Sequence, residues 1–164
     1  MSVLLKHPER FMPKALANPT ICIDQVDTGY IETLIGYNAR RAALAVIEVF
    51  LQRLAPYKLR PVDFSVASLI VHNPGITSRQ LCSTLGILPP NLVGLINMLQ
   101  KRGLICKRPH PSDGRANGLH ATATGIALLR AAETAATAVE DDVANNLTLA
   151  ERKTLLRLLK KVYL

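Results

Sequence analysis

The chain has 164 residues, which is enough for one domain with a substantial core and too few for two ordinary domains. Hydrophobic residues make up 49%, which excludes a disordered chain, and an aromatic share of only 4% favours aliphatic helices over a β-sandwich. A formal net charge of +8 predicts a polyanionic partner, either nucleic acid or an acidic membrane surface.

Several classes of protein are not expected from the same sequence. Cys22, Cys82 and Cys106 are widely spaced and form no Cys-x-x-Cys pair, so we expect no metal site. Their odd number, with no secretion signal, indicates reduced thiols and a cytoplasmic protein. No apolar run reaches the length of a membrane span, so no membrane partner is expected. No nucleophile–base spacing or phosphate-binding glycine loop is present, so we expect neither an enzyme nor a cofactor.

The N-terminal third is predicted to hold an arm and two helices. Residues 1–29 contain three prolines without a helical period and are expected to form an irregular arm. Residues 30–56 carry apolar side chains at helical spacing, which predicts a first, dimer-forming helix. Pro56 and Pro61 interrupt this helix, and residues 62–72 are predicted as a second helix.

The middle of the chain has the pattern of a helix-turn-helix. Thr77 and Gln80 form a capping box that begins a short helix, and Gly86 ends it. A second helix begins at the Pro89–Pro90 pair and ends at Gly103. This second helix is expected to bury one apolar stripe, namely Leu92, Leu95, Ile96 and Leu99. Its polar outer face is typical of a DNA recognition helix.

A β-hairpin and two further helices complete the prediction. Residues 104–109 and 117–121 are expected to form the two strands of the hairpin, and Thr122 caps a long helix after it. Thr148 and Glu151 form a capping box for the last helix. We therefore expect a mainly α fold with a small β-hairpin wing: a winged helix-turn-helix over residues 61–121 and terminal helices over 122–164, all in a single domain. The outer helices carry more apolar surface than this centre can cover, which predicts association with a second copy.

The run from Gly103 to Gly125 closely resembles the wing of MarR-type bacterial transcription regulators. The matching residues are Gly103, Leu104, Ile105, Lys107, Arg108, Asp113, Arg115, Ala116, Leu119, Thr122 and Gly125. The last helix is similar to the final dimerisation helix of that family. The resemblance spans about residues 30–162. It implies a homodimer with N- and C-terminal dimerisation helices that binds pseudo-palindromic double-stranded DNA and, in many members, releases it on binding a small aromatic or phenolic acid.

On this interpretation Arg115 enters the minor groove and Asp113 fixes the tip of the wing by accepting hydrogen bonds. The neighbouring cations are expected to contact phosphates, and these are Lys101, Arg102, Lys107 and Arg108. Ser78, Arg79 and Gln80 either hold phosphates or only cap their helix.

The recognition helix departs from the family, because Val93 and Gly94 stand where Thr and Arg are usual. Asn91 is expected to read adenine, Val93 a thymine methyl group, and Asn97 a base through water. With so few donors, DNA shape is expected to contribute much of the specificity.

An effector pocket is expected between the first helix, the second helix and the long helix after the wing. Its candidate lining residues are Tyr37, Arg41, Phe64 and His72. Each of these also has a plain alternative, such as a solvent-facing arginine or a partly buried histidine. The leading interpretation is a dimeric, sequence-specific repressor released by a small aromatic acid. The alternatives are a peroxide-sensing regulator that uses Cys22 and an interaction module that does not bind DNA.

Overall fold

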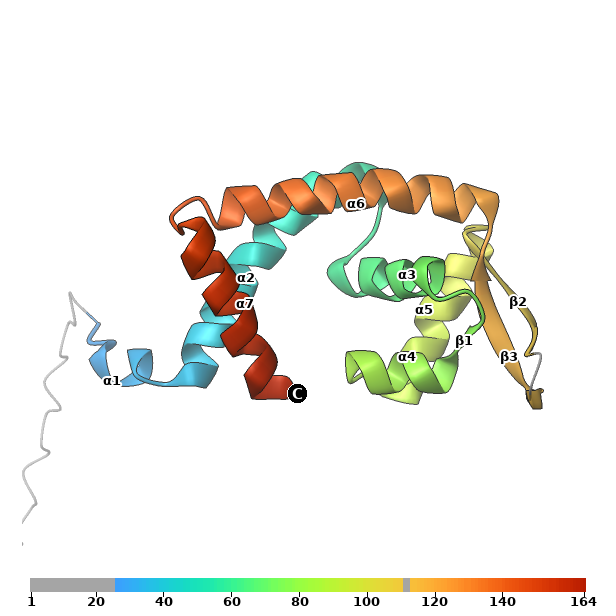
Figure 1. Ribbon diagram of the computed structural model, residues 1–164, viewed down its shortest axis with the longest axis horizontal. Helices are drawn as coiled ribbons and strands as arrows, with labels where there is room; N and C mark the ends of the chain where they lie inside the picture. The colour runs from blue at the N-terminus through green and yellow to red at the C-terminus, as the bar shows by residue number, and fades with distance from the viewer. Residues whose placement is uncertain (1–25, 111–112) are drawn as a thin grey trace, which may run out of the picture.

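A computed structural model describes residues 26–110 and 113–164, with side chains for 26–109 and 117–164. Its elements in chain order are α1 (Gly29–Glu32), α2 (Ile35–Leu54), a 3-10 turn η1 (Ala55–Tyr57), α3 (Pro61–His72), β1 (Ile76–Thr77), α4 (Ser78–Leu85), α5 (Pro89–Lys101), β2 (Ile105–His110), β3 (Asp113–Ala121), α6 (Ala123–Val143) and α7 (Leu149–Tyr163). The predicted fold class, mainly α with a winged helix-turn-helix, is confirmed. Figure 1 shows α6 running over the molecule, with α3, α4, α5 and the sheet below one end and α2 and α7 below the other.

The helix predicted over residues 30–56 is divided in two. The Asn38 side-chain amide donates to the backbone carbonyls of Glu32, at 2.7 Å, and Leu34, at 2.9 Å. Thr33 donates its hydroxyl to the Tyr30 carbonyl at 2.8 Å. The Tyr30 and Glu32 carbonyls thus accept from side chains in place of the backbone N–H groups of a continuous helix, and α1 ends at Glu32 while α2 begins at Ile35.

The sheet has one strand more than the predicted hairpin. β3 lies in the middle, antiparallel to β2 on one side and to the two-residue β1 on the other. Gly118 allows this close approach, because a Cβ atom there would lie 2.9 Å from the carbonyl oxygen of Gly75. A strand of two residues has no alternation to detect in a sequence, which is why the Asn-Pro-Gly segment before it indicated only a turn.

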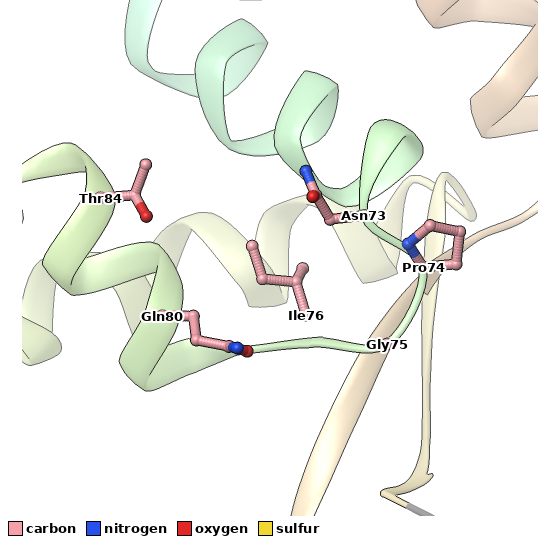
Figure 2. A pocket seen from close by; sticks show the side chains of 6 residues that line it. All are labelled: Asn73, Pro74, Gly75, Ile76, Gln80 and Thr84. Carbon is pink, nitrogen blue, oxygen red and sulfur yellow. The ribbon is translucent and has the colours of Figure 1, made fainter.

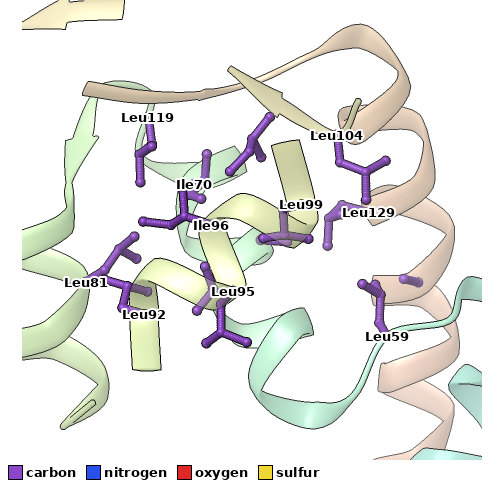
Figure 3. Close-up of a cluster of buried hydrophobic side chains, with 14 of the residues drawn as sticks. Leu59, Ile70, Leu81, Leu92, Leu95, Ile96, Leu99, Leu104, Leu119 and Leu129 are labelled. Carbon is purple, nitrogen blue, oxygen red and sulfur yellow. The ribbon is translucent and has the colours of Figure 1, made fainter. Parts of the chain in front are cut away.

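One core joins the winged helix to α6. The predicted stripe Leu92, Leu95, Ile96 and Leu99 is buried, as Figure 3 shows, and Leu129 of α6 lies in the same cluster. By contrast, α7 has no buried residue. The core therefore holds the winged helix against α6, and it includes no residue of α7.

The three predicted helix caps are all formed. The hydroxyls of Thr77, Thr122 and Thr148 accept hydrogen bonds from backbone N–H groups three residues later. Hydrogen bonds from the hydroxyl and backbone N–H of Thr148 lower the pKa of Glu151 below its usual value. Gly86 ends α4 with a left-handed φ of 63°, as its place in the sequence predicts.

In the part of the chain that the structure describes, no single helix has the length and hydropathy to cross a membrane. The pair α4 and α5 reaches both only when taken together, and these two helices are bent by 116° at their junction.

Candidate nucleic-acid interface

The 116° angle between α4 and α5 is that of a helix-turn-helix. The turn between them holds Gly86, Ile87 and Leu88, and Pro89 and Pro90 occupy the first turn of α5, where a missing N–H costs no hydrogen bond. Because α5 buries only one stripe of side chains in the core, its opposite side is open to solvent.

The open side of α5 presents the residues of this helix that were expected to contact DNA. Asn91, Val93, Gly94, Asn97 and Lys101 are all exposed. Val93 is 56% exposed, so its side chain is available to a partner. A Cβ atom on Gly94 would meet nothing within 4 Å. No contact inside the protein therefore requires a glycine here.

The start of α4 lies beside this face. Ser78 and Arg79 are exposed there. The Gln80 side-chain oxygen accepts from the backbone N–H of Thr77 at 2.9 Å and from its hydroxyl at 2.8 Å. Gln80 thus has the capping role that the sequence allowed, whereas the guanidinium of Arg79 forms no ion pair within the described residues.

Arg102, which was expected to contact a phosphate, forms hydrogen bonds within the protein. Its guanidinium donates to the backbone carbonyls of Tyr57 and Lys58, each at 2.8 Å. These two hydrogen bonds could not be predicted from the sequence, because both accepting carbonyls lie more than 40 residues from Arg102 along the chain.

Two of the residues expected to contact phosphates lie on the wing. Lys107 and Arg108 are exposed on β2, opposite Leu119 and Gly118 of β3, and successive strand residues point to opposite faces. The backbones of Asp113 and Arg115 belong to β3. Their side chains lie outside the described residues, so their expected roles remain predictions.

A polar hollow separates the base of the wing from α4. Figure 2 shows the six residues that line it, namely Asn73, Pro74, Gly75, Ile76, Gln80 and Thr84. None of these side chains is charged, so the hollow offers nothing specific to a phosphate or a carboxylate. It marks the junction at which β1 leads from α3 into the helix-turn-helix.

The four candidate effector residues fall into two groups. Phe64 packs edge to face against Phe50, with 5.5 Å between the ring centroids. Phe50 follows Tyr37 by 13 residues in α2, a distance of about 20 Å along the helix axis. Tyr37 and Arg41 therefore lie near the outer end of α2, far from Phe64 in the same copy of the chain.

His72, the fourth candidate, already has a partner. Its Nε2 atom lies 2.8 Å from Oε1 of Glu133, and the Ser68 hydroxyl donates to the same oxygen at 2.8 Å. Glu133, which joins α3 to α6, was not among the predicted site residues. No local sequence pattern could indicate this contact, because Glu133 lies more than 60 positions from both Ser68 and His72.

A large apolar groove lies between α2, α6 and α7. Its volume is about 720 Å³. Its walls include Ala42 and Val46 of α2, Val143 of α6, and Leu155 and Leu159 of α7. Further large apolar side chains are exposed on the same helices, namely Leu44, Ile47, Leu51, Leu156, Leu158 and Val162. Contiguous apolar surface of this kind marks a binding face.

The described residues hold no group of three or more metal-binding side chains. Cys82 and Cys106 are half-buried free thiols. Cys22, on which the peroxide-sensing alternative depends, lies outside the described residues.

Comparison with known proteins identifies relatives with this architecture. The sequence pattern of the MarR family matches residues 57–116. A protein of Thauera aromatica, named provisionally as a transcriptional regulatory protein for the hcr operon, is 29% identical over 130 residues, which are 79% of this chain and 78% of the relative.

Two solved structures are more similar. The transcriptional repressor CouR bound to a 23-mer DNA duplex has 38% identity and a TM-score of 0.78, and the match covers 84% of this chain and 98% of that one. CouR bound to p-coumaroyl-CoA has 36% identity and a TM-score of 0.75, with 84% and 97% covered.

Proposed function

Because the chain belongs to the MarR family and is a transcriptional regulator, not an enzyme, we propose that it is a dimeric repressor that leaves its operator when an aromatic effector binds. One observation carries the DNA-binding part: the exposed side of α5 and the exposed cations Lys107 and Arg108 of β2 belong to one winged helix. A helix for the major groove beside a basic wing is the arrangement by which such folds hold duplex DNA.

The apolar groove and the exposed leucines of α2 and α7 support the dimer. Since α7 has no buried residue and its leucines line an open apolar groove, a second copy is the occupant that would complete a core around this helix. Paired recognition helices then require a pseudo-palindromic operator whose half-sites lie about one helical turn, 34–36 Å, apart.

Single charge reversals test DNA binding. Lys107→Glu and Arg108→Glu are each expected to abolish binding at physiological salt, because each replaces a phosphate contact with a repulsive charge. Arg130→Glu is the matched control, since Arg130 is exposed on α6, away from the proposed face. Fluorescence anisotropy with a duplex that the wild-type protein selects from a random pool gives the measurement. Equal binding by all three variants would show that Lys107 and Arg108 do not hold the duplex. A wild-type protein that selects no duplex would favour an interaction module that does not use DNA.

For the effector, we propose a coenzyme A thioester of an aromatic acid in place of the free acid. The two groups of candidate residues are too far apart in one copy for a small phenolic acid to touch both. A long thioester with phosphate groups reaches further, and Arg41 with its neighbour Arg40 offers exposed guanidinium groups to those phosphates. CouR, at 36% identity, has been solved with such a ligand.

Thermal unfolding with p-coumaroyl-CoA, free p-coumarate or coenzyme A alone separates the possibilities. The thioester is expected to raise the melting temperature and release the duplex, since a ligand stabilises the state it binds. Arg41→Gln is expected to weaken this response. A response to p-coumarate alone at equal concentration would show that the free acid is sufficient.

The redox alternative stays a prediction that rests on Cys22. Replacement by serine is expected to leave DNA binding intact. Release by peroxide that is lost in the Cys22→Ser variant would establish that alternative.

A further inference from the structure

Arg102 is placed at the end of the recognition helix, where the chain leaves α5 for the wing. Gly103 follows with a φ of 70°, and its N–H donates to Gln100 while that of Leu104 donates to Leu99. These two bonds close the end of the helix as a Schellman motif. The backbone here is therefore fixed, and the Arg102 side chain leaves it in a defined direction.

The guanidinium reaches the turn that joins α2 to α3. Its two terminal nitrogens donate separately to the carbonyls of Tyr57 and Lys58, both at 2.8 Å. These carbonyls end the η1 turn that directly continues α2, where helix dipoles favour a cation. Lys58 has a left-handed φ of 52°, which costs energy for a residue with a side chain. Arg102 thus stabilises a strained turn.

This contact joins two helices with different tasks. α5 presents the base-reading face, whereas α2 lines the apolar groove that a second copy would fill. Arg102 is half-buried and both of its terminal nitrogens donate to carbonyls, while Lys101 beside it is exposed and forms no ion pair within the described residues. Adjacent cations of the same cluster therefore have separate roles.

We propose that Arg102 is a positioning residue that ties the recognition helix to the end of α2 and so sets the half-site spacing that the dimer accepts. The inference rests on the proposed dimeric DNA-binding function. A planar guanidinium bonds two carbonyls at once, whereas a lysine ammonium is a single point charge without this fork. Without the fork, α5 gains freedom relative to the dimer helices, and the distance between the two recognition helices is less strictly defined.

The test uses the full chain and a duplex selected by the wild-type protein from a random-sequence pool. Two further duplexes carry one base pair inserted or removed at the centre, which shifts and rotates one half-site relative to the other. Affinities are measured for wild type, Arg102→Lys and Arg102→Gln over a range of salt concentrations. Circular dichroism confirms that each variant is folded at the temperature used, and Arg102→Lys carries the test if Arg102→Gln unfolds.

Wild type is expected to prefer the original spacing, and the Arg102 variants to lose that preference by a factor of about 3 to 30, with an unchanged salt slope. Lys101→Gln is the matched control, with a salt slope smaller by about one unit and the spacing preference retained. A smaller salt slope in Arg102→Gln with normal spacing preference would make Arg102 a phosphate contact and overturn the inference. So would folded Arg102 variants with a lower melting temperature and wild-type spacing preference. If wild type selects no duplex, the proposed function itself fails.

Discussion

Gly125 is the glycine at which an added methyl group should do the most damage. It is buried in the first turn of α6, against the strand that begins the wing. A Cβ atom there would overlap the carbonyl oxygen of Leu104 and lie 2.9 Å from its carbonyl carbon. The hydroxyl of Thr122 donates to the Gly103 carbonyl at 2.7 Å, which holds the two segments together. The clash therefore falls on backbone that no side-chain rotation can relieve.

The expected cost of Gly125→Ala follows from these contacts. Overpacking costs about 1–3 kcal/mol, and a backbone neighbour places this site near the upper end. Alanine returns roughly 0.5–1 kcal/mol through its helix propensity, which leaves a net loss of about 2 kcal/mol. For a chain of this size, the melting temperature should fall by about 4–8 °C.

Thermal unfolding at one protein concentration measures the effect. Gly36→Ala is the control, because a Cβ atom on Gly36 would meet nothing within 4 Å. That variant is expected to match wild type or to gain up to about 1 kcal/mol. A Gly125→Ala protein as stable as Gly36→Ala would refute the account of how α6 is packed on the wing.

Three further results are expected. Gly94→Ala should raise stability by roughly 0.5–1 kcal/mol in urea unfolding yet weaken binding to the selected duplex, because the new methyl group stands on the proposed base-reading face. Undiminished affinity would mean that α5 does not approach the bases closely there. The hydrogen bonds that lower the pKa of Glu151 stabilise the fold above about pH 4.5, and this contribution is lost as the pH falls. The difference in stability between wild type and Glu151→Gln should therefore shrink between pH 7 and pH 3, and a constant difference in melting temperature would contradict this expectation. Glu133→Ala leaves Ser68 and His72 without their shared acceptor and should lower the free energy of unfolding by about 1 kcal/mol. An unchanged free energy of unfolding would show that this contact does not stabilise the packing of α3 on α6.

Local patterns account for the part of the fold that the sequence predicted. Each cap of α4 and α7 joins residues three apart, and the stripe from Leu92 to Leu99 follows the helical period, so both are visible in a linear chain. The same period could not reveal the break at Asn38, because that side chain turns back to carbonyls of a preceding segment.

For the candidate site, the sequence predicted which side chains are exposed but not which groups they bond to. Lys101 and Arg102 are adjacent cations at a helix end, and nothing in their order distinguishes them. Only the folded chain brings the η1 turn to Arg102 and leaves Lys101 in solvent. His72 shows the same limit, since its partner Glu133 stands on α6, 61 residues further along the chain.

The apolar groove has a consequence for how the protein would respond to its own abundance. When two copies must combine before either can grip an operator, occupancy at low levels rises with the square of the monomer concentration. Halving the supply of new chains would then reduce occupancy about fourfold, and dilution would also expose the apolar side of α7 that the proposed dimer covers. The steepness of gene control would thus originate in the leucines of a helix outside the proposed DNA-binding face.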